Sequence, residues 1–384
     1  MTIFKIKIMH VVAPCPEGLE NLLAEEILQF GGKDIKVFKR YVSFSCENET
    51  FYRLHFFSRI AFRFYRQISN FICFDKYDLY RGVQSSFDWS NWLPPNKSFC
   101  VTVSGTNSNL RHTHFTALQV KNAIVDLQKA TFGKRSNISL DTPYISIHLH
   151  IYKGEASLSL QSTLGSLHKR GYRPALGYAP IKENLAAGLI KYTDWDGKRP
   201  LIDLMCGSGT FLIEGLSQVL NIPTPLQKKY LFENWVDFDV DIFLHEKSKL
   251  LYKLPEKKLI PSIVGCDCDK KIINQAKTNI ALAGFENYID AKYCDFSELR
   301  TDTINDIGII LCNPPYGKKI GKDDALEELY TRLGIFLKER FSQWEFWLLS
   351  GNPSLTKYLK MKSTLKIPVS NGGIDCRWIK YLIR

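Results

Sequence analysis

Short apolar runs alternate with segments of helical spacing through the second half of the chain. The runs at 201–203, 263–267, 289–296, 307–312 and 345–350 are rich in aliphatic residues, and helical spacing appears at 210–216, 270–283 and 325–341. This alternation predicts parallel strands joined by crossover helices, and therefore an α/β domain. Two further strands, at 363–368 and 375–384, flank Asn371-Gly372-Gly373, a strong hairpin signal.

The first half has a different pattern, which predicts a smaller α+β module. Strands are expected at 3–12 and 99–104, a strand or hairpin at 35–46, helices at 19–30 and 115–131, and a hairpin at 145–161. The polar loop 105–114 precedes the second helix, so its amides, the helix N-terminus and Arg111 form a plausible phosphate cradle. His112 and His114 have no further ligands nearby in the sequence, so we expect no metal.

Charge separates the two halves of the chain. The formal net charge is +12, and residues 1–180 carry 22 Lys and Arg against 13 Asp and Glu, whereas residues 181–384 carry 29 against 26. A basic first half indicates contact with a polyanion, with nucleic acid as the leading candidate. The alternative is a solvated basic surface without a partner.

Aromatic and arginine residues interleave at 49–68. Such a segment can stack on bases and pair with phosphates. It can equally form a buried aromatic face with arginines reaching outward to water, and we favour this structural interpretation.

The ten cysteines are scattered, without a Cys-x-x-Cys pair, which indicates neither a zinc site nor a disulfide framework. Scattered cysteines without a disulfide framework are typical of proteins in the reducing cytosol. The first twelve residues are interrupted by Lys5 and Lys7 and do not read as a signal peptide. No apolar run approaches 18 residues, so we expect no membrane span.

The strand at 307–312 runs directly into Asn313-Pro314-Pro315-Tyr316. Two prolines stop the strand and hold the Asn amide and the Tyr ring at its carboxyl end. An Asn carbonyl and a proline-flanked carbonyl are acceptors suited to an exocyclic NH2 group, and Tyr316 offers a face to a flat base. The alternative is a purely structural role, as a proline-rich turn with a structural Asn.

A second stretch strengthens the first interpretation. The strand ending in Asp203 is followed by Cys206-Gly207-Ser208-Gly209-Thr210, whose glycines let the backbone approach a ligand at a helix N-terminus. The third glycine of the dinucleotide fingerprint is missing, which argues against a nicotinamide cofactor. Asp267 ends the next strand, where an acid can accept hydrogen bonds from a ribose diol. Asp295 ends the third, and each acid could alternatively cap a helix.

In combination, these motifs resemble those of class I S-adenosylmethionine-dependent methyltransferases that modify exocyclic or amide nitrogens. Residues 3–165 resemble a ferredoxin-like region followed by a THUMP domain, an RNA-binding module. Nearly the whole chain is similar to the THUMP-containing RNA guanine-N2 methyltransferases, most of all the bacterial 23S rRNA branch. The resemblance implies an N-terminal RNA-binding region at 1–165, a linker at 166–180, and a Rossmann-like methyltransferase domain at 181–384. That domain would hold a seven-stranded mixed sheet with a C-terminal antiparallel hairpin.

The resemblance also assigns roles to individual residues. It places Asn313, Pro314, Pro315 and Tyr316 at the reacting base, and it assigns S-adenosylmethionine to a larger set of residues. These are Glu183, Asn184, Asp203, Cys206, Gly207, Gly209, Thr210, Asp267, Asp295 and Phe296. Residues 217–260 depart from the family pattern, and we expect residues 235–238 within them to pack beside this site.

The function implied is methyl transfer to the exocyclic N2 of a guanine in 23S rRNA, in the cytoplasm. The alternatives are guanine-N2 methylation of tRNA, adenine-N6 methylation of nucleic acid, and a catalytically silent RNA-binding assembly protein. Protein glutamine methylation shares the Asn-Pro-Pro-Tyr motif, but the basic first half argues against it. The sequence leaves the oligomeric state open.

Overall fold

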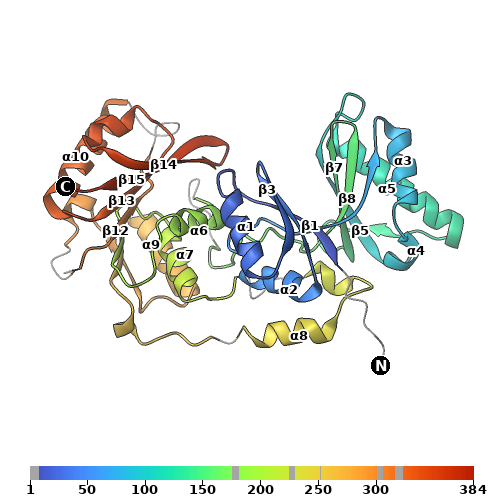
Figure 1. Ribbon diagram of the computed structural model, residues 1–384, viewed down its shortest axis with the longest axis horizontal. Helices are drawn as coiled ribbons and strands as arrows, with labels where there is room; N and C mark the ends of the chain where they lie inside the picture. Colours follow the sequence, from blue (N-terminus) through green and yellow to red (C-terminus); the bar gives the residue numbers. More distant parts are fainter. Residues whose placement is uncertain are drawn as a thin grey trace. The chain divides into compact units, whose positions relative to one another are not determined.

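The computed structural model in Figure 1 describes residues 8–174, 181–224, 230–250, 252–300, 304, 306–315 and 323–384. The chain forms two compact units. The first comprises Met1–Cys15, Ala24–Leu167 and Leu226–Lys249, and the second comprises Pro16–Leu23, His168–Pro225 and Leu250–Arg384. Each unit is built on one sheet, of eight strands in the first and seven in the second.

The sheet of the second unit has the order β11-β10-β9-β12-β13-β15-β14. Its five parallel strands are β9 (Leu201–Asp203), β10 (Ile263–Asp267), β11 (Ile289–Tyr293), β12 (Ile309–Cys312) and β13 (Glu345–Ser350). The last two strands, β14 (Ser363–Asn371) and β15 (Ile374–Leu382), form an antiparallel hairpin, and β15 runs antiparallel to β13. The expected α/β fold with its closing hairpin is confirmed.

Burial explains why the central strands of this sheet are so apolar. All residues of β9 and β12 are buried, as expected for parallel strands covered on both faces. The helices are α6 (Glu183–Lys191), α7 (Thr210–Val219), α9 (Lys270–Leu282) and α10 (Asp323–Arg340). Tyr330, Leu333 and Leu337 of α10 join Ile202 and Ile310 in one core cluster.

The first unit has the strand order β2-β3-β1-β4-β8-β7-β5-β6. The elements of its first part are β1 (Met9–Pro14), α1 (Glu20–Gln29), β2 (Lys33–Phe38), β3 (Tyr41–Cys46), α2 (Asn48–Phe57) and β4 (Tyr65–Ile72). Those of its second part are α3 (Lys76–Ser85), α4 (Trp89–Trp92), β5 (Ser98–Gly105), α5 (Thr113–Phe132), β6 (Asn137–Ile138), β7 (Ile145–Tyr152) and β8 (Glu155–Gln161). Pairing of β4 with β8 joins the two parts into one sheet.

The interleaved aromatic and arginine segment forms α2 and the start of β4, and its aromatic side chains are buried. Phe51, Tyr52 and Phe56 are all inside the unit, so the structural interpretation of residues 49–68 is confirmed. The arginines differ from expectation, because Arg66 is only 7% exposed. It is held inside by two hydrogen bonds to Asp237, of 2.8 and 2.7 Å.

Asp237 belongs to residues 230–249, which we call the strap. The strap comprises η1 (Leu231–Asn234) and α8 (Val240–Ser248), and it packs within the first unit although it lies in the sequence between α7 and β10. Trp235 lies 5.7 Å from Phe51, centroid to centroid, and Phe232 stacks on Tyr52 at 5.1 Å. The expectation that residues 235–238 pack beside the candidate site stays a prediction.

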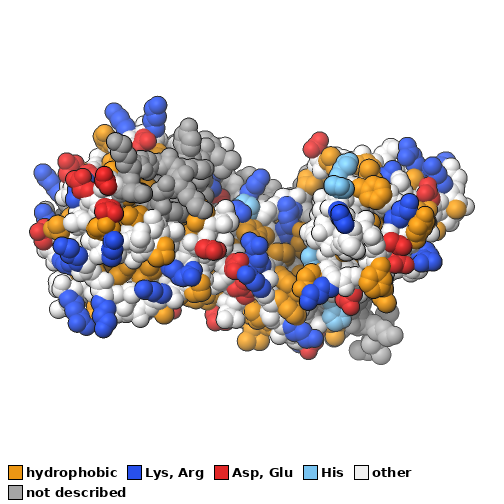
Figure 2. Space-filling model, turned by 90° about the horizontal axis from the view of Figure 1, so that it is seen from above, with side chains coloured by type: hydrophobic (Ala, Val, Ile, Leu, Met, Phe, Trp, Pro, Cys, Tyr) orange, Lys and Arg blue, Asp and Glu red, His pale blue; other side chains and the backbone are white. Residues whose placement is uncertain are grey.

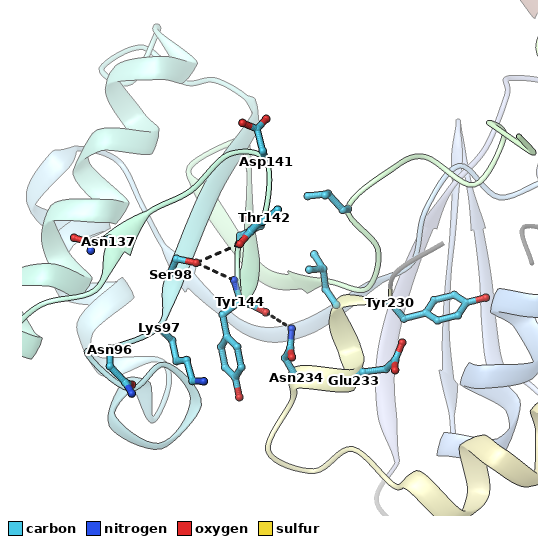
Figure 3. Close-up of a pocket in the computed structure, with 13 residues that line it drawn as sticks. Asn96, Lys97, Ser98, Asn137, Asp141, Thr142, Tyr144, Tyr230, Glu233 and Asn234 are labelled. Atoms are coloured by element: carbon cyan, nitrogen blue, oxygen red, sulfur yellow. Dashed lines mark hydrogen bonds between the residues drawn. The ribbon is translucent and has the colours of Figure 1, made fainter. Parts of the chain in front are cut away.

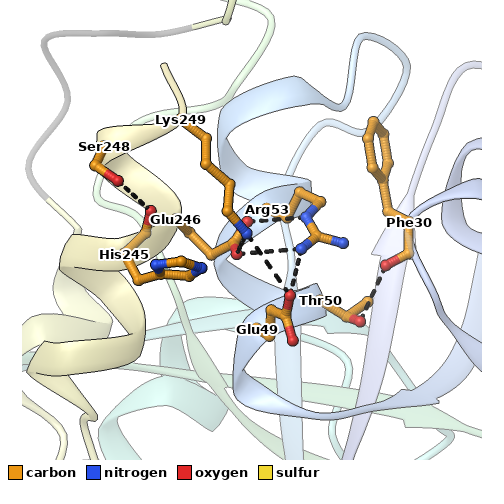
Figure 4. A network of polar contacts seen from close by, with 8 residues as sticks. All are labelled: Phe30, Glu49, Thr50, Arg53, His245, Glu246, Ser248 and Lys249. Carbon is orange, nitrogen blue, oxygen red and sulfur yellow. Dashed lines mark hydrogen bonds and ion pairs between the residues drawn. The ribbon is translucent and has the colours of Figure 1, made fainter. Parts of the chain in front are cut away.

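A buried ion pair completes the docking of the strap. Glu246 of α8 has a side chain that is 1% exposed, and it accepts hydrogen bonds of 2.8 and 3.1 Å from Nε and Nη2 of Arg53 in α2. Figure 4 shows Lys249 reaching the same carboxylate. Burying a carboxylate is costly unless it is paired, so these contacts fix how α8 lies on α2.

Of the helices that the structure describes, none has both the length and the apolar character needed to cross a membrane.

Candidate functional site

The site begins at the carboxyl ends of three adjacent strands in the second unit. β9 lies between β10 and β12, and Asp203 at its end is in register with Gly265 on one side and Leu311 on the other. This is the point at which the order of parallel strands reverses, where open α/β sheets bind ligands. Asp203, Asp267 and Asn313 therefore belong to one edge of one sheet.

The loop after β9 is shaped by its glycines. Gly207 and Gly209 have φ angles of +53° and +80°, in the left-handed region that favours glycine. Gly209 is the residue before α7, so the loop presents backbone amides at the amino end of a helix. The Gly207 amide donates to Oδ2 of Asp267 at 3.1 Å, which ties this loop to the end of β10.

Asp203 is a buried carboxyl with an unused acceptor. Its Oδ1 accepts a long hydrogen bond of 3.4 Å from the Met205 amide, and its Oδ2 has no hydrogen-bond partner among the described residues. Burial, with a smaller contribution from Asp267, raises the pKa of Asp203 to about 8. A cationic ligand group at this position would stabilise the ionised carboxylate.

Asp267 is half-buried and accepts two backbone hydrogen bonds, from Gly207 at 3.1 Å and from Asp269 at 3.0 Å. Burial raises the pKa of Asp267, although these two amides oppose the shift. Each carboxylate oxygen can accept a further hydrogen bond, as a ribose diol would require. The helix cap of α9 is Asp269 and not Asp267, so the capping alternative does not explain Asp267.

Asp295 and Phe296 follow β11, and the structure gives both of them other contacts. Asp295 caps the 3-10 helix η3 (Phe296–Glu298), and its Oδ1 accepts from Ser297 and, at 2.9 Å, from Arg332. Burial tends to raise the pKa of Asp295, but these donors outweigh it and lower the pKa. The Phe296 ring lies in the core against Phe336, at 5.4 Å. Their contact with an adenine stays a prediction.

Glu183 and Asn184 open α6, and both are buried. Oε1 of Glu183 lies 3.4 Å from Nε of Arg173, while its Oε2 has no hydrogen-bond partner among the described residues. Burial raises the pKa of Glu183 despite the nearby Arg173 guanidinium. The Nη1 atom of Arg173 also donates to Oγ1 of Thr210 at 3.0 Å and to the carbonyl of Ile181 at 2.9 Å.

Arg173 thereby joins the first residues of α6 and α7, the two helix starts to which the sequence assigns the cofactor. From the sequence, the segment that contains Arg173 is predicted only to be a basic linker. Its neighbours are buried too: Arg170 lies 3.5 Å from Glu214, and the Tyr172 hydroxyl donates to the same carboxylate at 3.0 Å. Arginines at fixed spacing before a helix cannot be distinguished from solvated linker charges until their carboxylate partners are known.

Asn313 follows directly after β12. Its Oδ1 is buried and has no hydrogen-bond partner among the described residues, and Pro314 beside it is buried. Buried polar atoms are nearly always satisfied, so this oxygen is suited to accept a hydrogen bond from a ligand. Tyr316 lies outside the described residues, and its stacking role stays a prediction.

Three cysteines surround these strand ends without offering a nucleophile. Cys206, Cys266 and Cys312 are buried, and burial is the main cause that raises the pKa of each thiol. A thiol kept protonated is a poor nucleophile, so the site is suited to binding and not to covalent catalysis.

The first unit contains a separate hollow of about 600 Å³, beside β5, the segment before β7 and η1. Figure 3 shows Lys97, Tyr144 and Asn234 along it. Lys97 Nζ lies 4.9 Å from the centre of the Tyr144 ring, and Asn234 donates to the Tyr144 carbonyl at 2.9 Å. The loop 105–114 follows the other end of β5 and is partly closed on itself, because Arg111 donates to the Ser108 carbonyl. Its role as a phosphate cradle stays a prediction.

A parallel sheet that ends in an antiparallel hairpin, with acids after its first two strands and a glycine loop between them, defines the class I methyltransferase fold. Comparisons with known proteins agree with this class. Residues 170–380 match the family described as "RMKL-like, methyltransferase domain", residues 75–161 match the THUMP domain, and residues 10–65 match the RlmL ferredoxin-like domain.

Two relatives and one solved structure show how far the similarity extends. A protein of Synechocystis sp. named as a candidate RNA methyltransferase is 38% identical over 370 residues, which cover 96% of this chain and 95% of that protein. The ribosomal RNA large subunit methyltransferase K/L of Vibrio parahaemolyticus is 36% identical over 375 residues, covering 97% of this chain and 53% of that protein. The crystal structure of SMU.472, a methyltransferase candidate complexed with SAH, superposes with a TM-score of 0.87 at 26% identity and covers 98% of this chain and 99% of that one.

The chain therefore belongs to the family of THUMP-containing RNA methyltransferases with an RMKL-like methyltransferase domain. It is an enzyme that uses S-adenosylmethionine, and its substrate is RNA. The family, cofactor and enzyme class expected from the sequence are confirmed. The chain spans about half the length of the K/L relatives. The boundaries expected at 165 and 180 stay predictions.

The described residues fit this cofactor. S-adenosylmethionine carries an ammonium group, a sulfonium and a ribose diol. Oxygen acceptors stabilise the two cations and accept hydrogen bonds from the diol. The edge of the sheet offers an unpartnered Asp203 Oδ2 and a half-buried Asp267 carboxylate, beside a glycine loop open to close approach.

Proposed function

We propose that this chain methylates the exocyclic N2 of a guanine in 23S rRNA. The observation that carries the proposal is the Asn313 carbonyl oxygen, buried and without a partner among the described residues, at the end of β12. An amino group donates hydrogen bonds, and this oxygen is an acceptor held ready for one.

The residues around Asn313 can activate an amine by position and electrostatics. The N2 lone pair of guanine is delocalised into the ring and is a weak nucleophile. When Asn313 Oδ1 and the Pro314 carbonyl accept its two hydrogens, they favour the positive charge that develops on nitrogen. The stiff Pro314-Pro315 backbone fixes both acceptors before the base arrives.

The cofactor supplies an already activated methyl group on a sulfonium, so this chain needs no covalent nucleophile. We assign Asp203 to a cationic group of the cofactor, Asp267 to its ribose hydroxyls, and the loop containing Cys206, Gly207 and Gly209 to close backbone contact. We assign Thr210 to the wall around the methionine moiety, and Glu183 and Asn184 to closing over the cofactor. Asp295 and Phe296 are assigned to the adenine side. Tyr316 is assigned to stacking on the base.

Three observations support ribosomal RNA as the substrate. The K/L relatives are named for ribosomal RNA of the large subunit. The chain carries a THUMP domain, and residues 1–180 hold a surplus of Lys and Arg over Asp and Glu. An rRNA substrate also supports a cytoplasmic location.

The experiment combines the purified full-length protein, tritiated S-adenosylmethionine and 23S rRNA from cells that lack the modification. Digestion to nucleosides should place the label on N2-methylguanosine. Label on N6-methyladenosine, or preferential labelling of tRNA, would contradict the proposal.

The catalytically silent alternative has its own test. Calorimetry should show that the protein binds S-adenosylmethionine, because Asp203, Asp267 and the glycine loop are intact. If neither cofactor binding nor transfer is found, the protein acts through RNA binding alone.

A further inference from the structure

Three connections of the first unit meet at one end of its sheet. They are the segment from Ile72 to Tyr77 between β4 and α3, the β7–β8 turn, and the loop after β5. The Cys73 amide donates to the Gly154 carbonyl at 2.8 Å, and Asn107 and Asn109 donate to the carbonyls of Cys73 and Phe74 at 2.9 and 3.1 Å. We call Ile72, Phe74, Lys76, Tyr77, Tyr152 and Lys153 the tip.

The tip exposes large apolar side chains on a rigid base. Ile72, Phe74, Tyr77 and Tyr152 are 67%, 60%, 64% and 61% exposed. Ile72 and Tyr152 are both in register with Glu155, one from each side, so they flank it on one face of the sheet. The Phe74 ring covers Gly154 so closely that an added Cβ would lie 2.4 Å from it. Clustered exposed aromatics usually mark an interaction site.

Cations lie on two of these rings. The Lys76 ammonium is 5.0 Å from the centre of the Tyr77 ring, and the Lys153 ammonium is 5.2 Å from that of Tyr152. Figure 2 shows hydrophobic side chains exposed among Lys and Arg over this unit. Aromatic faces beside lysines are the pattern that binds unpaired nucleotides, because bases stack on the rings and phosphates meet the cations.

The acidic residues near the tip do not neutralise its lysines. Oδ1 of Asp75 accepts the amides of Tyr77 and Asp78 at 2.8 and 2.9 Å and so caps α3. Asp78 accepts the Phe74 amide at 3.1 Å and pairs with Arg81 at 2.9 Å. Glu155 is the acid between Ile72 and Tyr152, and it would favour a base amino group over a phosphate there.

The β2–β3 hairpin of the same unit carries a similar set of side chains. Phe38 is exposed and stacks on Tyr41 at 4.7 Å, and Lys36 beside it is exposed.

We propose that the tip binds unpaired nucleotides of the RNA substrate, with bases stacked on Phe74, Tyr77 and Tyr152 and phosphates bound by Lys76 and Lys153. This inference rests on the proposed function only in taking RNA as the ligand. It does not depend on which base is methylated.

The test measures binding of a fluorescent 12-nucleotide single-stranded RNA to the full-length protein by anisotropy. The double variant Tyr77→Ala/Tyr152→Ala should bind about 10- to 100-fold more weakly. Tyr77→Phe/Tyr152→Phe should bind like the wild type, because stacking needs the ring and not the hydroxyl. Tyr293→Ala, an exposed tyrosine of the second unit, is the matched control.

Further measurements separate a binding effect from misfolding. All variants should keep the wild-type melting temperature and S-adenosylmethionine affinity. Lys76→Gln/Lys153→Gln should lower the slope of log affinity against log salt by about 1 to 1.5. Unchanged RNA affinity in the alanine double variant would overturn the inference and favour a protein partner for the tip. Methylation of a base other than guanine would overturn the proposed function alone.

Discussion

At the scale of single residues, the strand ends of the site hold Asp203 Oδ2 and Asn313 Oδ1 as buried acceptors without a partner among the described residues. A buried polar atom without a hydrogen bond costs about 1–3 kcal/mol. Asp203 Oδ2 and Asn313 Oδ1 both bear this cost among the described residues, at the ends of adjacent strands. Under the proposed function, this cost in stability holds the two acceptors in place for the cofactor and the base.

Asn313→Ala tests the second acceptor. We expect kcat to fall about 10²- to 10³-fold, because one oriented hydrogen bond to the developing charge is lost. Affinity for S-adenosylmethionine, measured by calorimetry, should stay unchanged. Asn287→Ala removes an exposed amide after α9 and should leave both values unchanged. Equal activity of the two variants would contradict the role of Asn313.

The raised pKa of Asp203 predicts that the stability of the cofactor-free protein depends on pH. Its folded pKa of about 8 lies above the value of about 3.9 expected in the unfolded chain. The folded state therefore binds the extra proton, and the stabilisation is present at low pH and lost as pH rises from about 4 to about 8.

Asp203→Asn should remove this dependence. Urea unfolding at pH 5.5 and 8.5 should show that the variant gains stability relative to the wild type as pH rises, with the larger gain at pH 8.5. Its affinity for S-adenosylmethionine should fall, because the ionised carboxylate is lost. A difference between variant and wild type that is the same at both pH values would exclude a raised pKa.

At the scale of elements, Arg173 joins the starts of α6 and α7. Arg173→Gln leaves the Glu183 carboxylate buried without its cation, which should cost about 3 kcal/mol of unfolding free energy. Adding Glu183→Gln should recover much of that loss, since no buried charge is left. Cofactor affinity should stay low in both variants, and recovery of affinity together with stability would show that the pair is only structural.

The strap is held to α2 by a second ion pair. A double-mutant cycle with Arg53→Met and Glu246→Gln should give a coupling of about 1–3 kcal/mol in urea unfolding, because Glu246 is buried. The exposed pair Lys33–Glu47, at 3.3 Å, should give below about 1 kcal/mol in the same cycle. Similar coupling energies for both pairs would mean that the Arg53–Glu246 ion pair does not anchor the strap.

The sequence predicted the elements whose patterns are local. The parallel strands were evident because β9 and β12 are fully buried and their residues are apolar. Asp203, Asp267 and Asn313 could be predicted as site residues because each stands at the end of such a strand or directly after it. The location of the strap was not predicted, because it depends on contacts that no local pattern reveals. Trp235 contacts Phe51 and Glu246 pairs with Arg53, and both partners lie almost two hundred residues earlier in the chain. Arg173 was missed for the same reason.

At the scale of the whole molecule, three segments of the chain form the first unit. Met1–Cys15 and Ala24–Leu167 build most of it, and Leu226–Lys249 return to it from within the methyltransferase sequence. Phe232 and Trp235 of the strap are buried there. Deleting the N-terminal unit would expose them, so RNA binding and catalysis are best separated by point variants and not by truncation.

The most direct measurement is a map of modified nucleotides in 23S rRNA from cells that lack this gene. One guanine should lose its N2-methyl group, and the wild-type gene should restore it. A gene encoding Asn313→Ala should not restore it, although the protein is folded and binds the cofactor. An unchanged map of 23S rRNA, or the loss of a methyl group from adenine or from tRNA instead, would contradict the proposed function.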